Sequence, residues 1–303
     1  MKKAIVTGAN GFIGSAIVKE LLNRKVKVYA LGRASNKSNI PAGAHFVEYD
    51  LTDSKKLVDL ITDGDIDVFY HCAWTGSAGT ARFDTALQLQ NAQWTIENIQ
   101  TAKALGCKRV VCAGSIMEQE TIMASYAQGN QPGKGYIYGS GKVVAHLMAM
   151  PVAVDLGIDL VWAEITNAYG AGELSPRFIN TTIRKIINHE PLQFTAGTQN
   201  YDFVYIDDVA RAFYLIGENG RPYHHYLIGS SNAKPLREYI LEIKEAIAQD
   251  QEFVFGDIPF TGVDLPLEKF DCSLTENHTG FIAEISFQEG IKKTMEWIKV
   301  NNL

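Results

Sequence analysis

Residues 3–14 read KAIVTGANGFIG, and they decide the fold of this chain. The apolar run at residues 4–6 predicts a buried parallel strand, and apolar side chains at helical spacing after the glycines predict a helix. Gly8 gives the turn unrestricted φ, Gly11 lets the backbone approach a phosphate, and Gly14 lets the helix pack closely on the strand. Together these elements form a pyrophosphate cradle, and this context disfavours a turn that merely needs glycine.

The first 166 residues repeat this alternation of strand and helix. Strands are predicted at residues 26–31, 45–49, 67–73, 109–113 and 158–165, and helices at residues 54–62, 82–105 and 138–156, the last interrupted by Pro151. Alternating strands and helices predict an α/β fold with a doubly wound parallel sheet of the Rossmann type and right-handed crossovers.

Beyond Asn167 the predicted elements are shorter. Helices are predicted at residues 175–188, 208–216, 236–248 and 286–300, and strands at residues 201–206 and 226–228. Since no linker separates these pieces, we expect the two parts of the chain to be interwoven. The expected parts are a dinucleotide-binding domain over residues 1–166, with return segments near 200–230, and a smaller α/β substrate lobe from residues 167–199 and 231–303.

Length, composition and charge restrict the function classes. The 303 residues, 46% apolar and 20% charged, suit one large α/β domain with a smaller lobe. A net charge of −6 without a basic tract argues against a nucleic-acid partner, and no run approaches the length of a membrane span. The start is too broken for a signal peptide, and the four cysteines lack zinc-like pairing. We therefore expect a reduced, cytoplasmic protein without a metal.

The end of the second strand usually reads the adenosine ribose of a bound dinucleotide. Here the strand ends at Leu31-Gly32-Arg33, without an acid that would bind the 2′-hydroxyl. Arg33 can instead pair with a 2′-phosphate, helped by Ser35 or Lys37, so NADP is favoured over NAD. The alternative is a solvated surface arginine.

The strongest chemical signal is Tyr138-Gly139-Ser140-Gly141-Lys142, at the start of a predicted long helix. Residues four apart share a helix face, and an ammonium beside a phenol stabilises the phenolate. The pair can therefore move a proton at a carbinol while a hydride passes to or from nicotinamide. Ser115 ends the fifth strand at the same sheet edge, where it can bond the substrate oxygen. Such a pair is common by chance, and Ser115 and the glycine cradle give it weight.

The Gly-x-x-Gly-x-x-Gly spacing resembles that of the extended short-chain dehydrogenases/reductases. Further segments resemble their NAD-dependent epimerase/dehydratase family, whose members act on nucleotide sugars. These segments are Asn91–Thr95, Asn167–Gly170, Asp202–Ala210 (Asp-Phe-Val-Tyr-Ile-Asp-Asp-Val-Ala) and Tyr226–Ser230. The resemblance covers nearly the whole chain. It implies an enzyme that binds NADP or NAD and a nucleotide sugar, and that forms a homodimer through the helices at 82–105 and 138–156.

The resemblance also assigns residues to roles. The catalytic triad would be Ser115, Tyr138 and Lys142, supported by Asn91. The cofactor would be bound by Gly8, Asn10, Gly11, Phe12, Ile13, Gly14, Arg33, Asp50, Leu51, Ala73, Tyr138 and Lys142. The substrate would be bound by Trp74, Ser115, Met117, Asn167, Arg177 and Tyr201. Asp50 would accept a hydrogen bond from the adenine amino group; its alternative role is an N-cap, which Asp53 fits better.

Departures from the family pattern separate the possible reactions. Ile116 and Met117 stand where dehydratases carry an Asp-Glu pair, so elimination of water is disfavoured, and Glu118 and Glu120 are out of register for it. Tyr201 and Glu164 stand where arginines usually grip the diphosphate. Other arginines, namely Arg177, Arg184 and Arg237, are candidates to replace them.

The choice of cofactor bears on the choice of reaction. A reductase exchanges NADPH at each turnover, whereas an epimerase generally retains NAD. Arg33 therefore favours reduction of a 4-keto (6-deoxy) sugar nucleotide, with a nucleotide-sugar 4-epimerase as the alternative. A reductase of a non-nucleotide carbonyl compound and a catalytically silent NAD(P)-sensing protein are further alternatives, and the intact Ser115, Tyr138 and Lys142 argue against the last.

Overall fold

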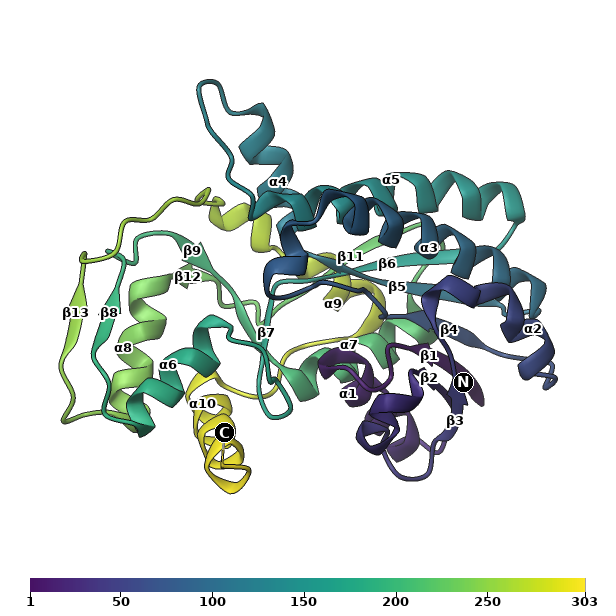
Figure 1. The fold of residues 1–303 in the computed structure, drawn as a ribbon, viewed down its shortest axis with the longest axis horizontal. Helices are drawn as coiled ribbons and strands as arrows, with labels where there is room; N and C mark the ends of the chain where they lie inside the picture. Colours follow the sequence, from purple (N-terminus) through teal and green to yellow (C-terminus); the bar gives the residue numbers. More distant parts are fainter. Residues whose placement is uncertain (303) are drawn as a thin grey trace.

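The computed structural model describes residues 1–302, apart from the side chain of Asn36, and its centre is a seven-stranded sheet (Figure 1). The strands run in the order β11-β6-β5-β4-β1-β2-β3, and all neighbours are parallel. Their bounds are β1 (Lys3–Thr7), β2 (Lys27–Gly32), β3 (His45–Glu48), β4 (Val68–His71), β5 (Arg109–Ser115), β6 (Asp159–Ile165) and β11 (His225–Ile228). The predicted doubly wound sheet is confirmed, and strand order reverses beside β1, where such sheets bind ligands.

Helices cover both faces of the sheet (Figure 1). α1 (Phe12–Asn23) and α7 (Ile206–Asn219) pack together on one face, and α3 (Thr85–Ala104) and α5 (Tyr136–Leu156) pack together on the other. The short α9 (Ser273–Thr279) packs against α7 and β11, although its residues fall in the range predicted for the smaller lobe.

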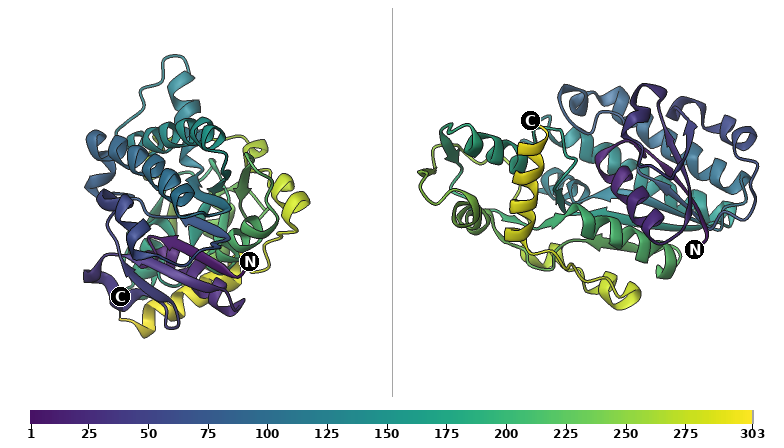
Figure 2. Two further views of the ribbon diagram at one scale, coloured as in Figure 1. Left: turned by 90° about the vertical axis from the view of Figure 1, so that its right-hand side faces the viewer. Right: turned by 90° about the horizontal axis from the view of Figure 1, so that it is seen from below.

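The remaining elements form a smaller lobe beside the carboxyl ends of the strands. It contains three two-stranded sheets, in which β7 (Asn167–Tyr169) pairs with β10 (Phe203–Tyr205), β8 (Leu192–Phe194) with β13 (Phe253–Phe255), and β9 (Asn200–Tyr201) with β12 (Lys234–Pro235). Its helices are α6 (Phe178–Ile187), α8 (Leu236–Ile247) and α10 (Phe287–Val300). Figure 2 shows α10, in yellow, lying between the rest of this lobe and the sheet.

Several elements differ from the prediction. α4 (Met117–Tyr126) was not predicted, and in Figure 1 it projects beyond α5. The predicted helix at 54–62 is a 3-10 turn, η2 (Leu51–Lys56), followed by one helical turn, α2 (Leu57–Leu60). Further 3-10 turns are η1 (Ala34–Asn39), η3 (Thr80–Phe83) and η4 (Leu267–Phe270).

Two helix boundaries have local causes. The helix predicted from residue 82 begins at Thr85, because the Asp84 carboxylate caps it by accepting the backbone N–H of Leu87 at 3.1 Å. The predicted interruption of α5 at Pro151 is wrong, since the helix continues through it. Pro151 and Leu147 are both exposed, so the backbone carbonyl that loses its partner lies on the side of the helix that water can reach.

α5 also corrects the expectation that no segment reaches the length of a membrane span. Its 21 residues are long and apolar enough to cross a membrane by length and composition, with 39% of its most apolar window buried. The helix lies along α3 and covers the sheet, which accounts for its apolar composition.

Candidate active site

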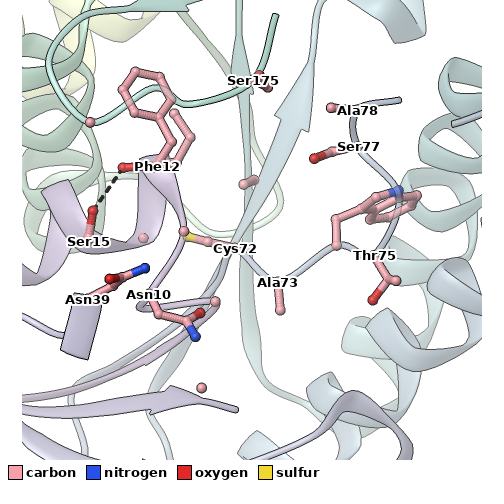
Figure 3. A pocket seen from close by; sticks show the side chains of 18 of the residues that line it. Asn10, Phe12, Ser15, Asn39, Cys72, Ala73, Thr75, Ser77, Ala78 and Ser175 are labelled. Carbon is pink, nitrogen blue, oxygen red and sulfur yellow. Dashed lines mark hydrogen bonds between the residues drawn. The ribbon is translucent and has the colours of Figure 1, made fainter. Parts of the chain in front are cut away.

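A cavity of about 710 Å³ runs along the carboxyl ends of the central strands. Figure 3 shows Asn10 and Phe12 on one side of it and Ala73, Thr75 and Ser77 on the other. Every residue predicted to bind the cofactor lines this one cavity: Gly8, Asn10, Gly11, Phe12, Ile13, Gly14, Arg33, Asp50, Leu51, Ala73, Tyr138 and Lys142. The glycine turn and the Tyr-x-x-x-Lys pair, more than a hundred positions apart in the sequence, therefore face one space.

The glycine turn has the geometry of a phosphate cradle. Gly8 has φ +67°, and a Cβ on Gly14 would lie 2.1 Å from the carbonyl oxygen of Gly8. The chain therefore turns and packs α1 against β1 only because both residues are glycine. Gly11 precedes α1, and no side chain caps the helix, so its first N–H groups are available to an anion. The residues present thus fit a dinucleotide pyrophosphate.

The ribose end of the cavity is more acidic than the sequence suggested. Arg33 is exposed and lines the cavity as predicted. A neighbouring hollow of about 300 Å³ brings Glu48, Asp50 and Asp53 to the same place, together with Lys56, which pairs with Asp53 at 2.8 Å. The preference for Asp53 as the N-cap is wrong, because Asp50 caps η2 by accepting the backbone N–H of Thr52 at 3.1 Å.

α5 places the predicted proton-transfer pair against the sheet. The Lys142 ammonium donates to the carbonyl oxygen of Ala113 at 2.7 Å and lies 3.8 Å from the ring centroid of Trp74. The Trp74 and Tyr138 rings meet edge to face, with centroids 6.0 Å apart. Lys142 is 5% exposed, so β5 and the Trp74 indole fix where its charge lies.

Other predicted site residues lie outside the lining of this cavity. Ser115 ends β5, and its hydroxyl accepts the backbone N–H of Met117 at 3.3 Å. Asn167 donates from its side chain to the backbone carbonyl of Asp202 at 3.3 Å. Tyr201 stacks on Phe203, and burial raises its pKa to about 12. Of the predicted substrate residues, Trp74 and Arg177 do line the cavity.

Sequence reasoning missed a buried polar network behind Ser115. Oε1 of Glu118 accepts the backbone N–H of Ser115 at 2.9 Å and the Trp162 indole N–H at 3.1 Å. Oε2 of Glu118 lies 2.9 Å from Nδ1 of His146. Glu118 is 3% exposed and joins three elements, since Ser115 ends β5, Trp162 lies in β6 and His146 lies in α5.

The signal for this network was present in the sequence. His146 follows Tyr138 and Lys142 at the same four-residue spacing, so it continues their stripe on α5. A second buried carboxylate, Glu164, accepts from the side chain of Gln119 at 2.9 Å and lies 2.7 Å from Nε2 of His225. Although burial acts against it, this contact raises the pKa of His225.

We expect Glu118→Ala to lower both stability and turnover. Alanine removes both carboxylate oxygens and leaves the backbone N–H of Ser115 and the indole N–H of Trp162 without this acceptor, at a cost of about 1–3 kcal/mol in the free energy of unfolding. Because the Ser115 backbone N–H loses this partner, kcat should also fall, whereas the Kd for NAD should not change. Thermal unfolding, steady-state kinetics and NAD titration measure these effects. Glu296→Ala, at an exposed position of α10, is the matched control. Equal kcat values in the two variants would show that Glu118 does not position Ser115.

A second residue that the sequence left unassigned lies against Tyr138, the predicted catalytic tyrosine. The guanidinium carbon of Arg82, in η3, lies 4.4 Å from the ring centroid of Tyr138. Tyr138 thus has one cation beyond its ring face and another, Lys142, one helical turn away on its own helix.

The sequence profile of the NAD dependent epimerase/dehydratase family matches residues 4–229. The chain belongs to this family. Its enzymes are extended short-chain dehydrogenases/reductases, as the motifs predicted, so the family assignment is confirmed.

Individual relatives span nearly the whole chain. A putative UDP-glucose 4-epimerase of Methanocaldococcus jannaschii is 28% identical, over 98% of this chain and 99% of its own length. The crystal structure of UDP-glucose 4-epimerase from Thermotoga maritima with UDP-glucose superposes with a TM-score of 0.83 at 20% identity, covering 99% of this chain and 100% of that one. The crystal structure of UDP-glucuronic acid 4-epimerase from Bacillus cereus in complex with NAD superposes with a TM-score of 0.78 at 20% identity, covering 99% of this chain and 100% of that one. The two solved structures therefore share the fold of this chain over nearly its whole length.

Proposed function

We propose that this enzyme oxidises and reduces carbon 4 of a nucleoside-diphosphate sugar with a bound nicotinamide dinucleotide. The observation that carries the proposal is that Tyr138 and Lys142 line the same cavity as the Gly8–Gly14 cradle. A dinucleotide whose pyrophosphate occupies the cradle would extend along the strand ends towards the phenol. When bound, the nicotinamide supplies a hydride acceptor or donor.

The side chains of this chain would handle the proton and orient the sugar. The Tyr138 phenolate removes the proton of the 4-hydroxyl and returns it after reduction. The Lys142 ammonium, held by the Ala113 carbonyl, stabilises the phenolate. The Ser115 hydroxyl accepts from Met117, so its own proton is free to bond the substrate oxygen.

Of the two reactions considered, we favour the 4-epimerase that retains NAD. Glu48 and Asp50 line the same hollow as Arg33, whereas Asp53 there is paired with Lys56 at 2.8 Å, so a 2′-phosphate beside Arg33 would face two further carboxylates. The Bacillus cereus epimerase structure contains NAD, which agrees with this choice. The 4-ketoreductase that uses NADPH is the second candidate, and Arg33 is the residue that favours it.

A panel of UDP-sugars and 4-keto sugars, each with NAD, NADH, NADP or NADPH, tests the proposal. Conversion of sugar without net change in absorbance of the cofactor would identify an epimerase. Stoichiometric loss of NADPH would identify a reductase. If no nucleotide sugar reacts under any of these conditions, the proposed substrate is wrong.

Replacement of Arg33 by Ala tests the cofactor separately. With NAD as the cofactor, the exposed arginine contributes about 0–1 kcal/mol, so the Kd for NAD should change by about fivefold or less. Wild-type enzyme should also bind NAD more tightly than NADP by fluorescence titration. A preference for NADP that disappears in Arg33→Ala would instead support the reductase.

We also propose a cytoplasmic homodimer that associates through α3 and α5, and the division into two domains predicted from the sequence, except that α9 belongs with the dinucleotide-binding domain. Support for the dimer comes from apolar side chains exposed on these helices, among them Leu89 at 58%, Leu147 at 70% and Val154 at 59%.

A further inference from the structure

We propose that Arg82 binds an acidic group on the sugar, so that the preferred substrate is a nucleoside-diphosphate sugar carrying a carboxylate. This inference rests on the proposed function, because it names the substrate class of the same site. What carries it is a partly buried guanidinium that lies against the ring of Tyr138 and makes one hydrogen bond to the rest of residues 1–302.

The contacts of Arg82 leave it short of acceptors. A guanidinium has five N–H donors, and the hydrogen bond that Arg82 makes is to the backbone carbonyl of Ser77, at 3.3 Å. Among residues 1–302, no carboxylate lies within 4.0 Å of it. A buried cation is stabilised by a paired anion, so the position of Arg82 favours an anionic ligand.

The backbone that carries Arg82 is fixed. The side-chain amide of Gln88 donates to the carbonyls of Gly76 at 3.0 Å and Ala81 at 3.1 Å, and accepts the indole N–H of Trp74 at 2.7 Å. Gln88 is 1% exposed, and a Cβ on Gly76 would lie 2.9 Å from the Ala81 carbonyl oxygen. One buried glutamine thus holds the tight loop before Arg82 together with the indole beneath Lys142.

The charges around Arg82 do not neutralise it. Burial lowers the pKa of Arg82, and the charge of Arg177 acts in the same direction, while Tyr138 and Glu120 oppose it. Arg177 itself pairs with Glu173 at 3.1 Å. Burial raises the pKa of Glu120 to about 7, and the charge of Arg82 acts against this shift, so this acid ionises less readily than an ordinary glutamate.

The place of Arg82 points to the sugar rather than to the nucleotide. In the proposed function Tyr138 acts at the reacting carbon, and Arg82, although it is not itself among the residues that line the cavity, contacts the ring of that side chain. A guanidinium also matches a carboxylate in a bidentate geometry, which a neutral sugar hydroxyl does not offer. A phosphate of the cofactor is the other anion that this guanidinium could meet.

Calorimetric binding of UDP-glucuronic acid and UDP-glucose to NAD-loaded Tyr138→Phe, in which turnover is blocked, tests the proposal. The uronate should bind about 10- to 100-fold more tightly, the value of one charge-assisted ion pair. Adding Arg82→Gln should remove this difference and leave the Kd for UDP-glucose nearly unchanged. Arg82→Lys should restore part of it, and Arg221→Gln, at an exposed position, should have no effect.

The outcomes separate this inference from the proposed function. If both sugars bind equally, or if Arg82→Gln weakens both to the same extent, the carboxylate assignment is wrong although nucleotide sugars are still the substrates. A loss of NAD affinity in Arg82→Gln would mean that the anion is a cofactor phosphate. If neither UDP-sugar binds, the proposed function fails together with the inference. In wild-type enzyme, kcat/KM should favour UDP-glucuronic acid by the same factor.

Discussion

Replacing Tyr138 by Phe is expected to lower kcat by about 10²- to 10⁴-fold, the usual contribution of a positioned acid or base. The phenylalanine keeps the ring that packs against Trp74 and beneath Arg82, so the cavity should retain its shape. The Kd for NAD and the unfolding temperature should therefore change little. Steady-state kinetics with the converted nucleotide sugar and a NAD titration measure the two effects.

Tyr126→Phe is the matched control for this change. Tyr126 ends α4 and is 81% exposed, so removal of its hydroxyl should affect neither kcat nor cofactor binding. Turnover by Tyr138→Phe at more than about a tenth of the wild-type rate would rule out the phenol as the proton carrier. A redox-sensing protein without catalysis would keep its output in both variants.

Gly14→Ala is expected to have the largest effect on folding and cofactor binding together. The new Cβ would lie 2.1 Å from the Gly8 carbonyl oxygen. The backbone fixes the position of a Cβ, and the oxygen is itself a backbone atom, so no side-chain rotation relieves this contact. Separating α1 from β1 should cost about 3 kcal/mol in the free energy of unfolding. It also displaces the N–H groups of the cradle, so the Kd for NAD should rise at least tenfold.

Gly64→Ala provides the comparison for this variant. No atom lies within 4 Å of a Cβ at Gly64, and its φ is not in the left-handed region, so stability should be nearly unchanged. Chemical denaturation and NAD titration of both variants measure the difference. Wild-type NAD affinity in a folded Gly14→Ala protein would show that the pyrophosphate does not occupy this turn.

Much of the fold and part of the site follow from local sequence patterns. The apolar run of β1, the glycine spacing and the Tyr138–Lys142 pair each depend on neighbours within a few residues. The order of strands and helices up to Ile165 could therefore be predicted, and so could the family, from motifs that keep their spacing. The twelve predicted cofactor residues line one cavity because parallel strands bring their carboxyl ends to one edge.

α4 could not be predicted because its pattern is the reverse of the usual one. Glu118 is buried, whereas Ile122, Met123 and Tyr126 on the same helix are exposed. Periodicity identifies a helix by a buried apolar face, and here a polar network takes that place. The prediction also started α3 too early, at residue 82, for a different reason. One capping carboxylate, that of Asp84, sets the first residue of the helix.

The sequence by itself determined the fold class, the glycine turn and the Tyr138–Lys142 pair proposed to transfer the proton, because these depend on short-range spacing and on backbone freedom at glycine. Only the tertiary structure decided what surrounds them. It set Glu118 behind Ser115, Arg82 over Tyr138, and three acids together with Lys56 in the hollow beside Arg33. These contacts join segments far apart in the chain, and their energies depend on burial and distance, which exist only once the chain has folded.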